Sequence, residues 1–326
     1  MSKASIIIPV YKTQEFLPKC IDSIMEQTFQ NFDVILINDC SPDKSQDVID
    51  TYVEKYPDKI RSIQNDHNLG QGQSRMKGVQ SSDSEYILFV DSDDYLAKDY
   101  LSTFIEQVEE EAYDIVVAGF TKVMEGKEIR HDIEQNDWTL VCYPLACCKM
   151  YRRDFIIENQ IDFSTVRRGE DIYFSLAAFC CDPKVKFISY FGYHYLLNTN
   201  STTESMDASS RIERTVSKMF HLLSERFSVD KLEESRRQKV EYAYLANMIN
   251  ALITYGHGCG PKIMKEKYEF FKEDLNHLFP EWKQNPNFHY LGFHGPNNRI
   301  KLGVCITMNL MKLHLAWPLY FVLSLV

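Results

Sequence analysis

Short apolar runs alternate with amphipathic segments through the first 123 residues. The apolar runs occupy 5–11, 32–39, 60–65, 85–94 and 114–123 and have the length of buried strands. Helical spacing of apolar residues predicts helices within 15–29 and at 44–55, 72–80 and 99–111. This alternation predicts an α/β domain whose sheet is mostly parallel.

The pattern changes further along the chain. Residues 124–140 are polar and irregular, as in a loop or an edge hairpin, whereas 144–161 are helix-like and 185–196 resemble a strand pair. Long helical patterns follow at 207–229, 231–256 and 261–278. We therefore expect an α/β domain over 1–205, a helical appendage over 206–280, a Pro- and Asn-rich linker over 281–298 and a tail over 299–326.

Charge and cysteine content narrow the class of protein. The chain has 36 Lys and Arg against 46 Asp and Glu, so its net charge of −10 argues against a general nucleic-acid-binding role. This net charge does not exclude a phosphate-bearing ligand that binds through a divalent metal ion. Cys147-Cys148 and Cys180-Cys181 lie in apolar stretches and no zinc spacing occurs, which indicates buried reduced thiols. The N-terminal apolar run is too short for a signal peptide, so we expect a cytoplasmic protein.

The tail combines basic and apolar residues. Lys312 and His314 interrupt its apolar run, which therefore does not read as a membrane span. Arg299, Lys301 and Lys312 beside apolar and aromatic residues favour peripheral contact with the inner face of the cell membrane. A helix that completes the core, or a contact in a homo-oligomer, is the alternative.

Candidate ligand-binding residues follow the predicted strands, because ligands bind beyond the carboxyl ends of parallel strands. Three of the first four strand ends are acidic, at Asp39, Asp66 and Asp91–Asp94. The first strand ends in Pro9-Val10-Tyr11 instead of GxGxxG, and no GxxxxGK[ST] occurs, which disfavours dinucleotide and P-loop sites.

The Asp91-Ser92-Asp93 spacing suggests a metal site. On an extended segment, residues two apart point the same way, so both carboxylates could face one Mg²⁺ or Mn²⁺ ion. A turn that caps a helix is the alternative, and the same alternative applies to Asp39.

Four segments together resemble the inverting, nucleotide-sugar-dependent glycosyltransferase family 2, of GT-A fold. They are SIIIPVYK, LINDCSPDKS, NLGQGQSRMKGV and EYILFVDSDDYL, in the order and approximate spacing of that family. Downstream, Arg168–Phe174 resembles the acceptor-side Glu-Asp motif, and Tyr193-His194-Tyr195 with Asn200-Ser201 resembles the stretch that closes the domain. The resemblance covers about residues 3–205.

The resemblance implies a role for each matching residue. Pro9, Val10 and Tyr11 would line the nucleotide pocket, and Asp39 would accept hydrogen bonds from a uracil-like edge or the ribose. Gly70 and Arg75 would lie near the nucleotide and diphosphate, with Asp91 and Ser92 also on the donor side. Asp93, with Asp91, would hold the metal. Asp171 would be the general base and Glu170 its supporting neighbour.

Three departures from the family pattern qualify these roles. Met76 follows Arg75 where Asn is common, Leu196 stands where an Arg is common, and no QxxRW motif occurs. The last absence favours transfer of a single sugar over processive synthesis.

The expectation is thus a glycosyltransferase that depends on Mn²⁺ or Mg²⁺ and moves one sugar from a UDP-sugar. The acceptor would be a saccharide or a lipid-linked saccharide in surface-polysaccharide biosynthesis. A nucleotidyltransferase and a non-catalytic sugar-nucleotide-binding protein are the alternatives.

Overall fold

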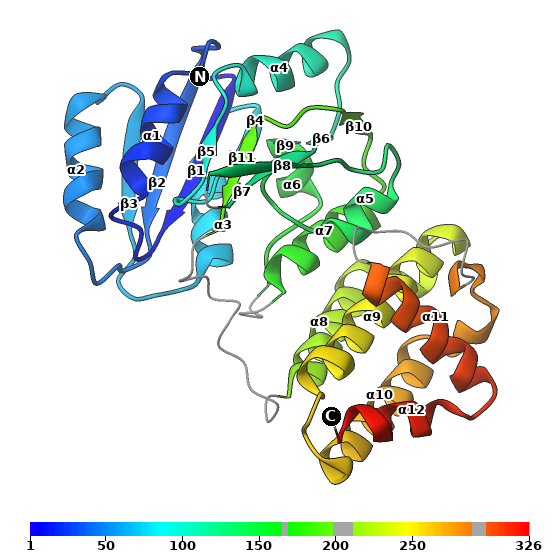
Figure 1. The fold of residues 1–326 in the computed structure, drawn as a ribbon. Helices are drawn as coiled ribbons and strands as arrows, with labels where there is room; N and C mark the ends of the chain where they lie inside the picture. Colours follow the sequence, from blue (N-terminus) through cyan, green and yellow to red (C-terminus); the bar gives the residue numbers. More distant parts are fainter. Residues whose placement is uncertain (125, 165–168, 198–210, 289–297, 326) are drawn as a thin grey trace. The chain divides into compact units, whose positions relative to one another are not determined.

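A computed structural model describes residues 1–124, 126–164, 169–197, 211–288 and 298–325. The chain divides into two compact units (Figure 1). Residues 1–136 and 145–199 form the α/β unit, and residues 137–144 and 200–326 form the helical unit. The boundary expected at residue 205 lies outside the described residues.

A seven-stranded sheet forms the core of the α/β unit. Its strands are β1 (Ala4–Val10), β2 (Phe32–Asn38), β3 (Ile60–Gln64), β4 (Tyr86–Phe89), β6 (Ile115–Ala118), β9 (Lys149–Arg152) and β10 (Val185–Ile188). They lie in the order β10-β6-β9-β4-β1-β2-β3, and β9 is antiparallel to both of its neighbours while the other pairs are parallel. The predicted α/β fold with a mostly parallel sheet is confirmed.

Helices α1 (Leu17–Met25), α2 (Ser45–Lys55), α3 (Gln71–Ser81), α4 (Tyr100–Glu110), α6 (Arg153–Glu158) and α7 (Glu170–Cys180) belong to this unit. Helix α3 contacts β1 and β2 closely. At Gly78, an added Cβ would lie only 2.4 Å from Ile7 Cγ2, so only glycine allows this approach. Helix α3 is thereby held beside the carboxyl ends of the central strands.

Pro9 lies in a central strand without disturbing the sheet. The pairing of β1 with β4 ends at Ile7 and Phe89, and Val90 donates to the Ile7 carbonyl at 3.1 Å. Pro9 faces the same side two residues later, past the end of that ladder. Its missing N–H therefore removes no inter-strand hydrogen bond.

A smaller sheet lies beside the first and has the order β5-β11-β7-β8. Its strands are β5 (Tyr95–Leu96), β7 (Phe120–Met124), β8 (Lys127–His131) and β11 (Tyr193–Leu196). The predicted strand 114–123 divides at Gly119 into one strand for each sheet, and β7 and β8 form the expected hairpin. Strands β10 and β11 likewise enter different sheets, so 185–196 is not a paired unit.

The helix expected over 144–161 is wrong in part. Residues Lys149–Arg152 form β9, between β4 and β6, and a helix begins only at Arg153. Four residues are too few for periodicity to separate a buried strand from a helix, and the pairing partners lie far away in sequence.

The helical unit contains α8 (Ile212–Phe227), α9 (Glu234–Tyr255), α10 (Pro261–Leu278), α11 (Asn298–Lys312) and α12 (Ala316–Leu323). It also contains α5 (Trp138–Cys142), a segment whose beginning was expected to be loop or hairpin. Trp138 packs edge to face on Tyr242 with ring centroids 5.2 Å apart, which explains why this short segment joins the helices.

The expected linker is not wholly irregular. It contains two 3₁₀ turns, Trp282–Gln284 and Pro286–Phe288, in which Trp282 and Phe288 are buried. Its residues 289–297 lie outside the described part of the chain. None of the described helices is long and apolar enough to cross a membrane.

Candidate active site

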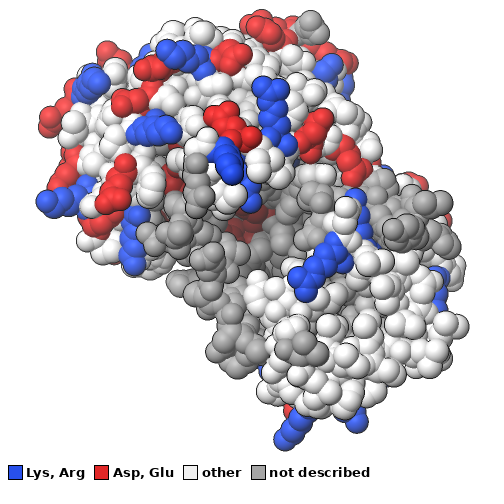
Figure 2. Space-filling model, in the orientation of Figure 1, with Lys and Arg blue, Asp and Glu red and all other residues white. Residues whose placement is uncertain are grey.

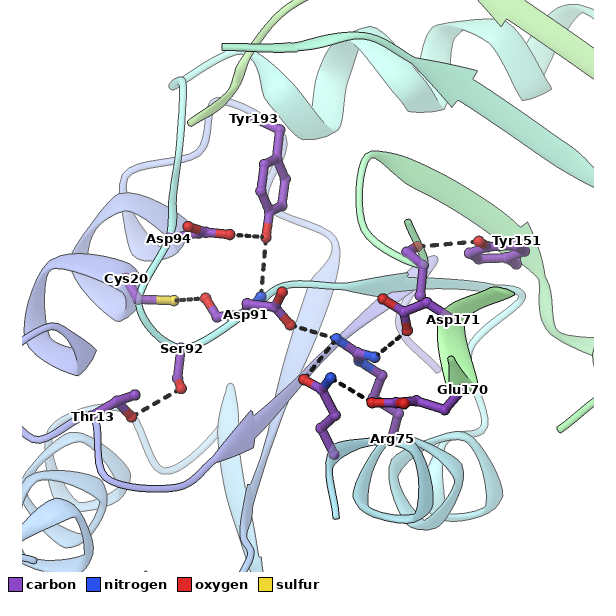
Figure 3. A network of polar contacts seen from close by, with 12 residues as sticks. Thr13, Cys20, Arg75, Asp91, Ser92, Asp94, Tyr151, Glu170, Asp171 and Tyr193 are labelled. Atoms are coloured by element: carbon purple, nitrogen blue, oxygen red, sulfur yellow. Dashed lines mark hydrogen bonds and ion pairs between the residues drawn. The ribbon is translucent and has the colours of Figure 1, made fainter. Parts of the chain in front are cut away.

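Arg75 connects two carboxylates at the end of the main sheet (Figure 3). It projects from α3 and is fully buried. Its Nη2 lies 2.5 Å from Asp91 Oδ1, after β4, and its Nη1 lies 2.7 Å from Asp171 Oδ1, at the start of α7. The two carboxylates are 29% and 26% exposed, so their outer sides remain accessible. One guanidinium thus joins a predicted donor-side residue to the predicted base.

Glu170 lies beside this arrangement and is held by α3. Gln71 Nε2 donates to Glu170 Oε1 at 2.7 Å, and Gln71 Oε1 accepts from Arg75 Nη2 at 3.5 Å. Glu170 therefore links α7 to α3, and its support of the base stays a prediction.

The Asp171 carboxylate is poised to exchange a proton near neutral pH. Burial disfavours its charged form and raises the pKa of Asp171 to about 6, although Arg75 acts in the opposite direction; Asp91 and Glu170 raise it further. A carboxyl with this pKa suits general-base catalysis.

Asp94 is the most enclosed acid of the DSDD segment. Its Oδ2 accepts from Tyr193 Oη at 2.6 Å and its Oδ1 from the Leu196 N–H at 2.8 Å. Tyr193 Oη is also 3.2 Å from the Asp91 N–H. Burial, followed by the charges of Asp91 and Asp93, raises the pKa of Asp94 above its usual range. Asp94 thereby ties β11 to the segment that carries Asp91.

The geometric basis expected for the Asp91-Ser92-Asp93 motif is wrong. Strand β4 ends at Phe89, and the Asp94 N–H donates to the Asp91 carbonyl at 3.0 Å, so residues 91–94 form a turn rather than an extended segment. The metal-binding roles of Asp91 and Asp93 stay predictions.

Asp39 lies farther along the same edge and does not cap the helix after it. Its Oδ1 accepts from the Asn65 side chain and the Leu69 N–H, both at 2.8 Å, and its Oδ2 accepts from the Gly70 N–H at 2.8 Å. Gly70, with φ of +89°, is the residue immediately before α3. Asp39 therefore fixes the start of the helix that carries Arg75.

The remaining predicted donor-side residues occupy the adjacent strand end. Pro9 and Val10 complete β1, Tyr11 follows it with an exposed ring, and Ser92 Oγ accepts from Thr13 Oγ1 at 2.9 Å. The structure brings the predicted site residues to the carboxyl end of one sheet, whereas Arg168, Asn200 and Ser201 of the two downstream motifs lie outside the described residues. Their contacts with a nucleotide sugar stay predictions.

A small cavity borders Asp171. It is lined by strands β7 and β11 of the smaller sheet, by the loops that carry Asp91 and Cys147, and by the start of α7: Asp91, Asp94, Phe120, Leu145, Cys147, Cys148, Asp171, Tyr193 and Tyr195. The aromatic rings offer faces on which a sugar ring can stack, and the carboxylates can accept hydrogen bonds from hydroxyl groups.

Sequence reasoning missed most of this lining. Phe120, Leu145 and Tyr195 belong to segments that resemble ordinary core sequence. Beneath them, Lys149 is buried and donates to the Leu145 carbonyl, while burial lowers the pKa of Lys149 to about 8. A lysine in an otherwise apolar segment was the one available signal.

Residues 5–165 match the family model described as Glycosyl transferase family 2. The chain belongs to glycosyltransferase family 2. It is similar to a poly(ribitol-phosphate) β-glucosyltransferase of Bacillus spizizenii, with 28% identity over 86% of this chain and 45% of the relative. It is also similar to the uncharacterized glycosyltransferase EpsJ of Bacillus subtilis, with 30% identity over 61% of this chain and 62% of the relative. The chain therefore spans about half of the first of these curated relatives and three fifths of the second.

Solved structures share the fold of this chain. TarS residues 1–349 of Staphylococcus aureus, in complex with UDP-GlcNAc, align with a TM-score of 0.70 over 96% of this chain and 92% of that one, at 20% identity. A mannosyltransferase of Pyrobaculum calidifontis in complex with GDP-Man and Mn²⁺ aligns with a TM-score of 0.55 over 99% and 84%, at 11% identity. The GT-A-like architecture is confirmed.

The charges at this site suit a divalent cation. Asp91 and Asp171 share the buried Arg75, and the charges of Asp91 and Asp93 act on the buried Asp94. The described residues contain no group of three or more ligands already arranged around a metal. A metal of this kind uses one or two carboxylates and completes its shell with substrate phosphates, so Asp91 and Asp93 fit that requirement.

Proposed function

We propose that this chain is a metal-dependent, inverting glycosyltransferase that moves one sugar from a UDP-sugar to a saccharide or a lipid-linked saccharide acceptor. Surface-polysaccharide assembly in the cytoplasm, at the inner face of the cell membrane, is the setting that we propose. The observation that carries the proposal is the Asp171 carboxylate, which faces the cavity and is joined to Asp91 through Arg75.

The donor lies along Pro9–Tyr11, Asp39 and Gly70 in this proposal. UDP is favoured because TarS, which shares the fold, was solved in complex with UDP-GlcNAc. The poly(ribitol-phosphate) β-glucosyltransferase of Bacillus spizizenii supports a polymeric acceptor.

Asp91 and Asp93 are the residues that hold the divalent cation. When bound, the cation stabilises negative charge on the departing diphosphate. The surrounding acids make a cation necessary there, since a pyrophosphate would otherwise meet several negative charges.

Asp171 accepts the proton of the acceptor hydroxyl. With its pKa near 6, the carboxylate is ionised at neutral pH and can take that proton as the hydroxyl attacks the anomeric carbon. Arg75 orients the carboxylate through Nη1 and leaves its other oxygen toward the cavity. Attack by one hydroxyl on the face opposite the leaving group inverts the anomeric configuration.

Donor binding and transfer test the proposal separately. A thermal-shift screen should show that UDP and UDP-sugars raise the melting temperature with Mn²⁺ and do so less in EDTA. GDP-mannose serves as the matched nucleotide control. UDP release in the presence of a saccharide acceptor then measures transfer. Absence of any metal-dependent shift with UDP compounds contradicts the donor assignment.

The two alternatives predict different products. A nucleotidyltransferase would release pyrophosphate from UTP and a sugar phosphate. A non-catalytic binding protein would show the thermal shift, but an Asp171→Asn variant would behave as the wild type in every transfer assay.

A further inference from the structure

Helix α11 is apolar on two opposite faces. Val304, Met308 and Met311 are buried and belong to the face that packs in the helical unit, where α11 contacts α9. Leu302 and Ile306 lie on the opposite face and are 46% and 40% exposed. A surface helix normally presents polar residues opposite its packed face, so a second apolar face indicates a further contact.

The exposed apolar face continues into α12 through a tight helix ending. His314 has φ of +59°, its N–H donates to the Met311 carbonyl at 3.1 Å, and the Leu315 N–H donates to the Leu310 carbonyl at 2.8 Å. These two bonds define a Schellman ending. They place the exposed Leu313 and Leu315 at the turn between the two helices.

Helix α12 adds further exposed apolar side chains. We call the whole set the tail surface: Leu302, Ile306, Leu313, Leu315, Phe321, Val322 and Leu325, all of them exposed. Trp317 packs edge to face on Phe321 with ring centroids 6.2 Å apart. Tryptophan and phenylalanine beside aliphatic residues are typical of segments that lie at a membrane–water interface.

The charge of this part of the chain differs from that of the rest. Residues 282–326 contain Lys283, Arg299, Lys301 and Lys312 and no Asp or Glu, whereas the whole chain has a net charge of −10. Figure 2 shows the visible face of the helical unit as largely uncharged, with a few basic groups. Contact of two tail surfaces in a symmetric dimer would bring like charges together, but an anionic lipid surface would attract them.

We propose that the tail surface binds the headgroup region of an anionic lipid bilayer. Leu302, Ile306 and the exposed residues of α12 enter the interface, and the net positive charge of residues 282–326 attracts this segment to anionic headgroups. This arrangement needs no membrane-spanning helix. It is independent of the donor, the metal and the transfer reaction.

Vesicle co-sedimentation of the full chain tests this proposal. Wild type should bind vesicles of equimolar phosphatidylglycerol and phosphatidylcholine at least tenfold more tightly than phosphatidylcholine alone, and added salt should weaken that binding. The Leu302→Glu/Ile306→Glu variant should lose at least tenfold in affinity for the anionic vesicles.

The α/β unit supplies a matched control. Ile129 and Ile157 are 47% and 41% exposed, so Ile129→Glu/Ile157→Glu places the same charges on equally exposed apolar side chains elsewhere. This control should bind as wild type does. Circular dichroism checks folding, and Lys301→Gln/Lys312→Gln gives a second test that leaves the apolar residues intact; it should weaken only the binding to anionic vesicles.

Three results would overturn the proposal. Wild type may not be retained by anionic vesicles at low salt, or the folded tail variant may bind as tightly as the matched control. Light scattering could instead show a wild-type dimer that the tail variant converts to a monomer, which would assign the surface to a second copy of the chain.

Discussion

Both units contain buried charged side chains, but the two sets are arranged differently. In the helical unit, Lys267 Nζ lies 2.9 Å from Glu213 Oε2, and the two side chains are 0% and 1% exposed. Asp274 there accepts from Tyr244 Oη and lies within hydrogen-bond distance of His221 Nε2, each at 2.7 Å. Each of these buried charges has a partner of opposite charge or a hydrogen-bonding partner within the helical unit.

In the α/β unit, acids outnumber their buried cationic partners. Arg75 is shared between Asp91 and Asp171, both of which border the cavity. Buried charge alone therefore does not identify a functional site in this chain. An excess of negative charge beside a cavity does identify such a site, because part of that charge remains available to bind a ligand.

Replacing Asp171 tests whether the charged residues of the α/β unit act in catalysis, and it should have the largest effect. Asp171→Asn keeps the shape of the side chain and its place beside Arg75 but cannot accept the acceptor proton. We expect kcat/KM for transfer to fall by about 10²–10⁴-fold, with the UDP thermal shift retained. Asp154→Asn, at a side chain 65% exposed on α6, is the control and should behave as wild type. Full transfer by Asp171→Asn would remove its catalytic role.

The buried pair of the helical unit should affect stability instead. Lys267→Met leaves Glu213 buried without its ammonium partner and should lower the free energy of unfolding by about 3–5 kcal/mol. The double variant Lys267→Met/Glu213→Leu should recover most of this loss, because no unpaired charge remains. Urea unfolding measures both. A catalytic defect in the folded double variant would contradict the structural reading of the pair.

The pH dependence of transfer sharpens the role of Arg75. Since Asp171 has a pKa of about 6 and acts when ionised, kcat/KM should fall as pH decreases through 6. Arg75 lowers the pKa of Asp171, so the Arg75→Met variant should lose activity at a higher pH than wild type and should also react more slowly. If the rate falls but the pH at which activity is lost does not change, Arg75 acts only on the donor side.

The smallest effect is expected at the turn between α11 and α12. His314 occupies a left-handed conformation, and His314→Gly should raise the free energy of unfolding by up to about 1 kcal/mol. Thermal unfolding measures it, and transfer should not change. A destabilised variant would show that the imidazole makes a contact that outweighs backbone strain.

The sequence predicted the α/β layers well because their signals are local. Apolar runs located β1, β2 and β4, and the acids that follow β2 and β4 marked the carboxyl edge of the sheet. The resemblance to family 2 then identified Asp171. This residue does not follow a predicted strand, so no local pattern marks it. Strand β9 was missed because its identity depends on pairing with β4 and β6, which lie far from it in sequence.

The sequence predicted which residues form the site but not how they are arranged in space. The sequence suggested that Asp91 and Asp93 share a face of an extended segment, whereas the backbone turns there. It also gave no indication that Arg75 would join Asp91 to Asp171, since residues 75, 91 and 171 meet only after α3 and α7 are packed. The walls of the cavity come from strands β7 and β11, from two loops and from α7, and no local pattern can specify that meeting.

Helix α3 is bonded to residues on both sides of the proposed reaction. Asp39 accepts a hydrogen bond from the N–H of Gly70, and Arg75 projects from the same helix little more than one turn later. The predicted nucleotide-side residue Asp39 and the predicted base Asp171 are thus both bonded to α3, so their positions depend on the same helix.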